Sequence, residues 1–241
     1  GKNCMIDMIL ASKFRPERLK LAVDNLFDNC TNENTKLILV TDHDDFITTL
    51  AAFELINKYP RRITSLINYF SSEGNVAALN YGTKLVTQKY LTYFADDCFI
   101  NLKGWDDLAI KLLEENPEYM CLNIRSNQNK NKVDWIGAEY AYSFVVNAEK
   151  FKNLGCFDNI YKRLYSDPDF FLKMIVSQEL MMTSKDIIFD HIITDDKIYE
   201  INNIISPHAR DRDVYLQRWN PLEKEIIESF NKIKDKWGKI V

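Results

Sequence analysis

Glycine is scarce in this chain, and its scarcity excludes two common kinds of nucleotide-binding site. The 241 residues include 7 glycines, and no group of them forms the GxGxxG pattern of a dinucleotide-binding Rossmann site. The GxxxxGKS/T pattern of a P-loop is missing as well. The chain therefore lacks the glycine-rich loops that usually wrap a dinucleotide or a nucleoside triphosphate.

The sequence also lacks the patterns of secreted and membrane proteins. Its five cysteines are an odd number and none of them forms a CxxC pair, so we interpret them as reduced core thiols of a cytoplasmic protein. No uninterrupted apolar run reaches about 18 residues, so no membrane span is expected. Residues 1–4 do not show the basic-then-apolar pattern of a signal peptide.

Positive charge is not in excess. Lys and Arg number 31 against 35 Asp and Glu, which gives a formal net charge of −4. A nucleic-acid-binding domain is usually strongly basic, so we expect no nucleic acid partner. Hydrophobic residues make up 46% of the chain, with 14 Phe, 12 Tyr and 4 Trp, which is enough to build a sizeable core and excludes a mainly disordered chain.

Strand and helix patterns alternate through the first half of the chain. Short apolar runs typical of buried strands are followed by segments whose apolar residues recur at helical spacing. The predicted strands are residues 5–11, 36–41, 63–69 and 90–94, and the predicted helices are residues 16–27, 46–59, 75–87 and 105–113. This alternation predicts an α/β fold with a mostly parallel central sheet flanked by helices.

The second half of the chain is less regular. Its predicted strands are residues 120–124, 139–147 and 187–189, and its predicted helices are residues 149–154, 169–179 and 221–237. Residues 126–132 are polar and predict an exposed loop. Residues 206–219 show no clear periodicity, and we interpret them as a mobile loop.

Acidic and small polar residues follow the strands of the first half. Ser12, Asp42, the segment 71–74 and the pair Asp96 and Asp97 come directly after the four predicted strands in turn. Ligands of parallel sheets bind beyond the carboxyl ends of the strands, so these residues are expected at one edge. Carboxylates at that edge indicate a divalent cation such as Mg²⁺ or Mn²⁺. The alternative is that Asp97 caps a turn and Asp96 is solvated.

Three groups of residues in the second half of the chain could take part in catalysis or in ligand binding. In the run Ser166-Asp167-Pro168-Asp169, Asp167 is expected to be a helix N-cap, and a carboxylate at such a helix start, facing the metal, could also be a general base. His191 follows a strand and is either a satisfied histidine or a metal ligand, a role for which His208 is the rival. The arginines of the 206–219 segment either pair with phosphates or lie solvated beside Asp211 and Asp213; they are Arg210, Arg212 and Arg218.

The order of these motifs resembles the family 2 type glycosyltransferases of GT-A fold, which use nucleotide-sugar donors. Residues 12–16, Asp42, Gly74, Asn80 and residues 95–100 resemble the nucleotide-binding half, and residues 155–158 with 166–169 resemble the acceptor half. The resemblance implies one GT-A domain over residues 1–241. Its nucleotide-sugar-binding half runs to about residue 103, its acceptor half covers about 104–219, and a C-terminal helix covers 220–241.

The resemblance also implies roles for matching residues. The donor nucleotide would contact Ser12, Arg15, Asp42, Gly74 and Asp96, with Arg210 or Arg212 closing over its phosphates. Asp97 would bind the Mn²⁺ or Mg²⁺ ion, together with Asp96 and His191. Asp167 would be the catalytic base of an inverting enzyme, and Asp169 would support the same helix start. Candidate stacking surfaces for an acceptor sugar are Trp135, Tyr140 and Tyr142, whereas Trp105 is expected in the core.

These implications predict metal-dependent transfer of a sugar from a nucleotide-diphosphate sugar, with a UDP-sugar favoured, to a hydroxyl group of a glycan or another acceptor. A sugar nucleotidyltransferase is a weaker alternative, because the first loop, residues 12–16, contains no glycine. A binding protein that has lost turnover is a second alternative. It would explain Ala95, where a strict DxD motif has Asp, and Ser166, where the family has Glu.

Overall fold

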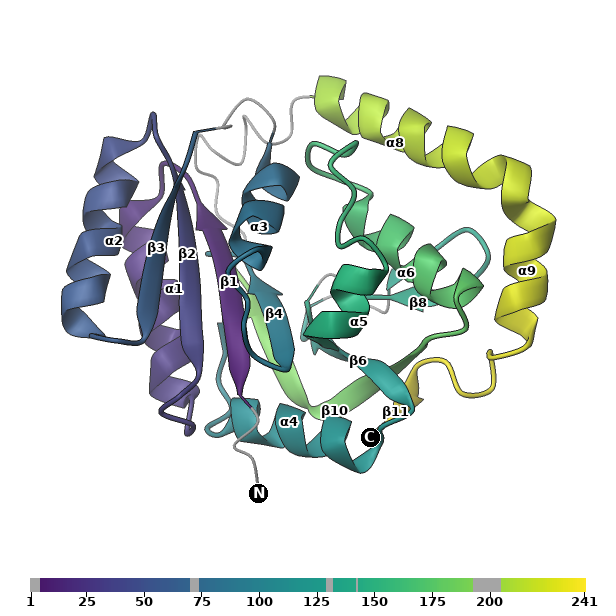
Figure 1. Ribbon diagram of the computed structural model, residues 1–241, viewed down its shortest axis with the longest axis horizontal. Coiled ribbons are helices and arrows are strands. Elements are labelled where there is room, and N and C mark those ends of the chain that lie inside the picture. Colours follow the sequence, from purple (N-terminus) through teal and green to yellow (C-terminus); the bar gives the residue numbers. More distant parts are fainter. Residues whose placement is uncertain (1–4, 70–73, 129–131, 142, 193–204) are drawn as a thin grey trace.

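A computed structural model describes residues 5–69, 74–128, 132–141, 143–192 and 205–241, and helices flank a large central sheet in these ranges (Figure 1). The strands of this sheet are β1 (Ile6–Ser12), β2 (Lys36–Asp42), β3 (Ile63–Asn68), β4 (Tyr90–Phe94), β5 (Cys98–Ile100), β6 (Tyr119–Ser126), β9 (Phe144–Asn147), β10 (Leu180–His191) and β11 (Lys239–Ile240). A small second sheet contains β7 (Lys132–Val133) and β8 (Glu139–Tyr140). The helices are α1 (Pro16–Asn29), α2 (Phe46–Lys58), α3 (Asn75–Thr83), α4 (Trp105–Glu115), α5 (Ala148–Asn153), α6 (Ser166–Val176), α8 (Ile205–Trp219) and α9 (Glu223–Asn231), with a 3₁₀ turn η2 (Asn220–Leu222).

The large sheet confirms the predicted α/β fold. Its strand order is β11-β10-β6-β9-β4-β1-β2-β3, and β5 pairs with β10. The pairings of β1 with β2, β1 with β4, β2 with β3 and β6 with β10 are all parallel. Strand β9 runs antiparallel between β4 and β6, so it joins the sheet of the first half to that of the second.

The first half folds largely as its residue pattern predicts, although the predicted helix over 75–87 ends at Thr83 and the short strand β5 was not predicted. Strands β1, β2 and β4 are buried along almost their whole length, as parallel strands are when helices cover both faces. In helix α1, Pro16 occupies the first turn and an apolar stripe that includes Leu19, Val23 and Leu26 is buried. Asp45 caps α2 by accepting a hydrogen bond of 3.0 Å from the Thr48 N–H.

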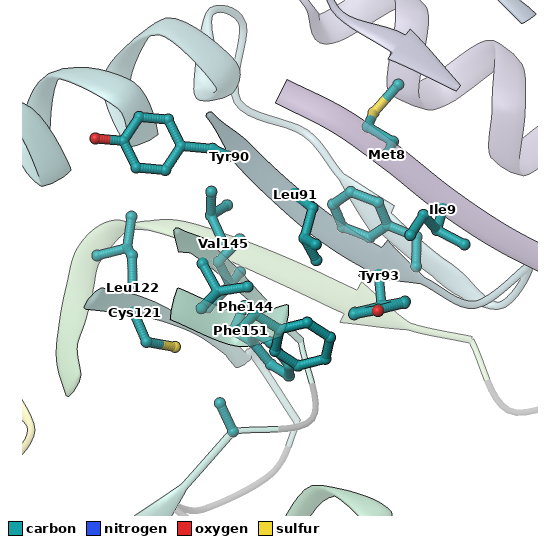
Figure 2. Close-up of a cluster of buried hydrophobic side chains, with 14 of the residues drawn as sticks. Met8, Ile9, Tyr90, Leu91, Tyr93, Cys121, Leu122, Phe144, Val145 and Phe151 are labelled. Atoms are coloured by element: carbon teal, nitrogen blue, oxygen red, sulfur yellow. The ribbon is translucent and has the colours of Figure 1, made fainter. Parts of the chain in front are cut away.

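The hydrophobic core crosses the boundary expected near residue 103. Buried side chains of the first half pack with those of β6, β9 and α5 (Figure 2). Trp105 is fully buried, and its ring meets that of Phe94 edge-on, with 5.4 Å between the ring centroids. The expectation that Trp105 belongs to the core is confirmed. The labelled core residues are Met8 and Ile9 of β1, Tyr90, Leu91 and Tyr93 of β4, Cys121 and Leu122 of β6, Phe144 and Val145 of β9, and Phe151 of α5.

The described ranges bear on two expectations from the sequence, the core position of the cysteines and the lack of a membrane span. Cys30, Cys98, Cys121 and Cys156 are all free thiols, and the first three are buried, as expected of core cysteines. Within the described part of the chain, no helix combines the length and the apolar character needed to cross a bilayer.

The predicted mobile loop over residues 206–219 is wrong, because these residues belong to helix α8, which lies with α9 along the outer side of the molecule (Figure 1). Asp211, Tyr215 and Trp219 are buried at intervals of four residues, which is the inward face of a helix. Because one of these buried positions is the charged residue Asp211, the sequence does not show the apolar periodicity that would predict a helix.

Other boundaries of the second half also differ from prediction. The predicted strand over 187–189 is the end of the much longer β10, and the predicted strand over 139–147 is split into β8 and β9. The predicted helix over 221–237 ends at Asn231, and the residues after its turn form β11 beside β10. Within the predicted loop over 126–132, Ser126 ends β6 and Lys132 begins β7, and residues 129–131 lie outside the described ranges.

Candidate active site

A pocket of about 560 Å³ lies where β1, β2 and β4 end. It brings together the side chains that follow these strands, as the parallel arrangement predicts. Arg163, from the segment before α6, reaches the same pocket. The site residues that are predicted for the donor or its metal ion and that line this pocket are Ser12, Arg15, Asp42, Gly74, Asp96 and Asp97. Residues 71–73 lie outside the described ranges.

Asp96 forms part of the buried wall of this first pocket. Its carboxylate accepts hydrogen bonds from Ser12 Oγ at 2.7 Å and Arg15 Nη1 at 2.9 Å. Burial raises the pKa of Asp96, and the Ser12 hydrogen bond and the Arg15 charge offset only part of that effect. The three side chains therefore form a fixed polar unit at the start of the first loop.

Asp42 lies at the end of β2 and forms a second polar unit. Asn68 Nδ2 donates to Asp42 Oδ1 at 2.9 Å, and Lys13 Nζ lies 2.9 Å from Asp42 Oδ2. Lys13 also pairs with Asp44, and Asp45 accepts a hydrogen bond from the backbone N–H of Phe14. The first loop is thus bonded to the loop after β2, which places both loops at the same pocket.

Asp97 and His191 form a pair that strand pairing fixes. His191 ends β10, which runs antiparallel to β5 with His191 opposite Cys98, and the Ile192 N–H donates to the Asp97 carbonyl oxygen at 2.9 Å. His191 Nε2 lies 3.2 Å from Asp97 Oδ2. The hydrogen bond to Asp97 raises the pKa of His191, although burial opposes it. Burial acts to raise the pKa of Asp97, but the His191 hydrogen bond and charge outweigh it and lower that pKa.

The predicted metal ligands are brought together only in part. Among the described residues, no group of three or more His, Cys, Asp or Glu side chains is arranged to hold a metal ion. Asp97 and His191 are neighbours, whereas the Asp96 carboxylate is bonded to Ser12 and Arg15. A single carboxylate with one further donor fits Mg²⁺ or Mn²⁺, since these ions take their remaining ligands from water and phosphate oxygens.

A second pocket of about 410 Å³ adjoins this pair. His191 lines it, and so does Asp167, which belongs to the first turn of α6. The interpretation of Asp167 as the helix N-cap is wrong, because Tyr165 holds that position with a left-handed φ of 66°. Burial raises the pKa of Asp167 to about 7. The other lining residues are Lys132, Tyr140, Leu164, Tyr165 and Pro168.

Asp169 differs from Asp167 in that it is fully buried and lines neither pocket. Its carboxylate accepts hydrogen bonds from Tyr161 OH at 2.8 Å, Arg218 Nη1 at 3.0 Å and Trp219 Nε1 at 2.8 Å. It therefore connects α6 to α8 and fixes the turn of helix that carries Asp167.

Neither arginine predicted for the phosphates lines the first pocket. Arg210 Nη1 donates to the Ile160 carbonyl oxygen and to Asp211, both at 2.8 Å, and Arg212 is exposed near Asp213. Arg163 does line this pocket, although it belongs to none of the motifs that predict the site. Its one sequence signal is its place between the two motifs of the acceptor half. Of the predicted stacking residues, Tyr140 lines the second pocket, Trp135 is 39% exposed, and Tyr142 lies outside the described ranges.

Comparison with known proteins gives one family and several solved structures. The model of the glycosyl transferase family 2 matches residues 7–188. A search of curated proteins finds no match. Among solved structures, the chain is similar to the mannosyltransferase PcManGT from Pyrobaculum calidifontis in complex with GDP-Man and Mn²⁺, with a TM-score of 0.69 and 13% identity over 95% of this chain and 75% of that chain.

The chain is also similar to TarS of S. aureus. It matches TarS 1–349 with a TM-score of 0.59 and 12% identity, over 80% of this chain and 58% of that one. It matches a second TarS structure with a TM-score of 0.61 and 15% identity, over 82% of this chain and 38% of that one. The chain therefore spans three quarters or less of the length of these structures, and the likeness concerns the fold.

Proposed function

The chain belongs to glycosyl transferase family 2 and has the GT-A fold, and we propose that this glycosyltransferase moves a sugar from a nucleotide-diphosphate sugar to an acceptor hydroxyl group. The observation that carries the proposal is the contact between two adjoining pockets. Asp97 lines the first pocket, His191 lines the second, and 3.2 Å separates their side chains. A donor in the first pocket and an acceptor in the second would meet at this pair.

The first pocket would bind the nucleotide. Asp42 offers a carboxylate for the N–H groups of a base, and the unit of Ser12, Arg15 and Asp96 offers a polar wall for the ribose. The sequence favours a UDP-sugar, whereas PcManGT is described in complex with GDP-Man, so the experiment below compares both donors.

Asp97 and His191 would hold the Mn²⁺ or Mg²⁺ ion. When bound, a divalent cation neutralises charge on a leaving diphosphate. The Mn²⁺ of the PcManGT complex supports this proposal. Asp97 suits such an ion because it is only partly shielded from solvent, with 22% of its side chain exposed, and because His191 keeps its carboxylate oriented.

Asp167 would be the general base. The acceptor oxygen would lose its proton to the Asp167 carboxylate as it attacks the anomeric carbon, while the bond from that carbon to the diphosphate oxygen breaks and the nucleoside diphosphate leaves. One displacement of this kind inverts the configuration of the sugar. A pKa of about 7 suits a base that works near neutral pH. Tyr140 and Tyr165 line the same pocket and offer aromatic surface to a sugar ring.

Release of nucleotide from UDP-, GDP- and dTDP-sugars, with and without Mn²⁺, tests the proposal, and a CMP-sugar, which carries a single phosphate, is the negative comparison. We expect metal-dependent release from one donor, and loss of that release in Asp97→Ala but not in Asp186→Ala, which removes an exposed carboxylate of β10. No release and no nucleotide binding by calorimetry would overturn the proposal. Metal-dependent binding without release or transfer, in the presence of a panel of glycan acceptors, would instead favour the binding protein that has lost turnover.

A further inference from the structure

The segment before α6, Ile160–Tyr165, reaches both pockets. Arg163 lines the first pocket together with Asp96 and Asp97. The two residues that follow it, Leu164 and Tyr165, line the second pocket. The backbone of this segment therefore sets the position of side chains on the donor side and on the acceptor side at once.

A single buried carboxylate on α8 binds this backbone. Asp211 is fully buried and accepts the N–H groups of three successive residues, Lys162 at 3.1 Å, Arg163 at 2.9 Å and Leu164 at 3.1 Å. Arg210 Nη1 donates to the same carboxylate at 2.8 Å. Hydrogen bonds to an ionised carboxylate are among the stronger ones in proteins, so these bonds define the course of the segment.

Gly74 holds the segment from the opposite side. Its φ of +87° is left-handed, and a Cβ atom at this position would lie 2.1 Å from the carbonyl oxygen of Lys162. The Val76 N–H donates to that same oxygen at 3.5 Å. The segment thus passes between α8 and the start of α3, and glycine at position 74 allows this close approach.

The position of Arg163 in the first pocket favours it as a contact for phosphate, because the diphosphate of a donor would lie at the proposed metal ion. Arg163 lines the wall that also carries Asp97, the proposed metal ligand. Burial lowers the pKa of Arg163, because its charged form loses contact with water.

We propose that Arg163 binds the diphosphate of the donor and that Asp211 is the positioning residue that holds Arg163 in the pocket. The inference rests on the proposed function. A guanidinium group matches the oxygens of a phosphate in a bidentate geometry, which a lysine does not reproduce. Arg210 then contributes through its bond to Asp211, and not through a bond of its own to phosphate.

Calorimetry with UDP and GDP, in the presence of Mn²⁺, tests the role of Arg163. We expect Arg163→Gln to weaken binding of the preferred nucleotide about 10-fold to 100-fold, Arg163→Lys to weaken it less, and neither to change binding of the matching nucleoside without phosphates. Lys162→Gln changes the neighbouring exposed side chain of the same segment and should have no effect. Equal binding by wild type and Arg163→Gln would overturn this inference alone. Failure of the wild type to bind any nucleoside diphosphate, dTDP included, would overturn the proposed function too.

A double-mutant comparison tests the role of Asp211. Asp211→Asn loses an acceptor oxygen and should weaken binding of the same nucleotide about threefold to tenfold. That effect should vanish when Arg163 is already Gln, because Asp211 acts through Arg163. Asp213→Asn, on the exposed face of α8, is the control. Equal weakening in both backgrounds would overturn the role of Asp211. If Asp211→Asn does not fold, Arg210→Gln weakens the same carboxylate unit more gently and is measured in the same two backgrounds.

Discussion

The two pockets are built by different means. The first is formed by the ends of β1, β2 and β4, whose parallel pairing fixes the positions of the residues after them. The second is assembled from the β7–β8 hairpin, the start of α6 and the end of β10. Two buried carboxylates, Asp169 of α6 and Asp211 of α8, hold the segments around it. The donor side therefore depends on the sheet, and the acceptor side depends on buried polar contacts.

The largest effect expected from this difference is on the acceptor side. Asp167→Asn should lower the transfer rate about 100-fold to 10,000-fold, because it removes the proposed base, while binding of nucleoside diphosphate in the first pocket stays unchanged. In the wild type, the rate should rise as the pH increases through about 7, where Asp167 ionises. Rates over pH 5–9 measure this, and a rate that does not change between pH 6 and 8 would contradict it.

The same substitution should stabilise the protein. The pKa of Asp167 is raised from 3.8 to about 7 on folding, so ionising this group costs the folded state stability as the pH rises from about 4 to about 7. Asp167→Asn removes that cost. Its melting temperature should therefore exceed that of the wild type at pH 8, and the difference should disappear near pH 4.

Asp169→Ala should have the next largest effect, on stability. The substitution leaves Arg218 and Trp219 without their shared acceptor, and it should lower the free energy of unfolding by about 3 kcal/mol. Urea unfolding measures this change, with the exposed Asp186→Asn within about 0.5 kcal/mol of wild type as the control. If the folded variant also fails to bind nucleoside diphosphate, then the first pocket depends on Asp169 as well, and the two pockets are not held by separate contacts.

Gly74→Ala should have an intermediate effect on both pockets, since Gly74 borders the segment that joins them. We expect a loss of about 1–3 kcal/mol of stability from backbone strain and from the approach of Cβ to the Lys162 carbonyl oxygen. Gly155→Ala is a matched control, because Gly155 has a φ of +90° but no neighbour within 4 Å of a Cβ atom. Equal thermal destabilisation by the two substitutions would show that the contact with Lys162 contributes nothing.

The smallest effect is expected from His191→Gln on stability. The raised pKa of His191 stabilises the fold at pH values below the ordinary 6.5, and this contribution is lost as the pH rises through the raised value. The lowered pKa of Asp97 contributes above 3.8 and is lost in acid. The substitution should therefore cost under about 1 kcal/mol, between about pH 4 and 6.5, and nothing at pH 9. Melting temperatures of the wild type and the variant at pH 5.5 and pH 9 compare the protein with charged and with neutral His191.

Sequence reasoning reached the first pocket because its residues lie at the ends of parallel strands, which meet at one edge of a sheet whatever the order of the strands. Ser12 and Asp42 end β1 and β2, and the pair Asp96 and Asp97 follows β4. The α/β fold followed from the alternation of strands and helices, and the GT-A fold followed from the resemblance of the motif order to the family. The roles proposed for these residues remain predictions for the experiments above.

The acceptor side was less predictable because its order depends on polar groups inside the fold. Asp211 lies on the buried face of α8, so the sequence of this helix lacks the apolar periodicity that would predict a helix. The position of Arg163 depends on the bonds from Asp211, so it could not be predicted without α8. The exposed Lys185 and Asp186 interrupt the buried pattern of β10, which hides its length. The contact of His191 with Asp97 depends on that full length, and the resemblance to the family supplied it only as a possible role.

The bonds to Asp211 also have a consequence for the order of folding. They join residues 47 to 49 positions apart in the chain, so the segment 162–164 stays unfixed until α8 has docked. The strands of the first pocket need no such late contact. We expect the amides of residues 162–164 to exchange with deuterium through local opening of α8, while those of β1 and β4 exchange only through global unfolding. The acceptor side can then open and close on a sheet that stays folded.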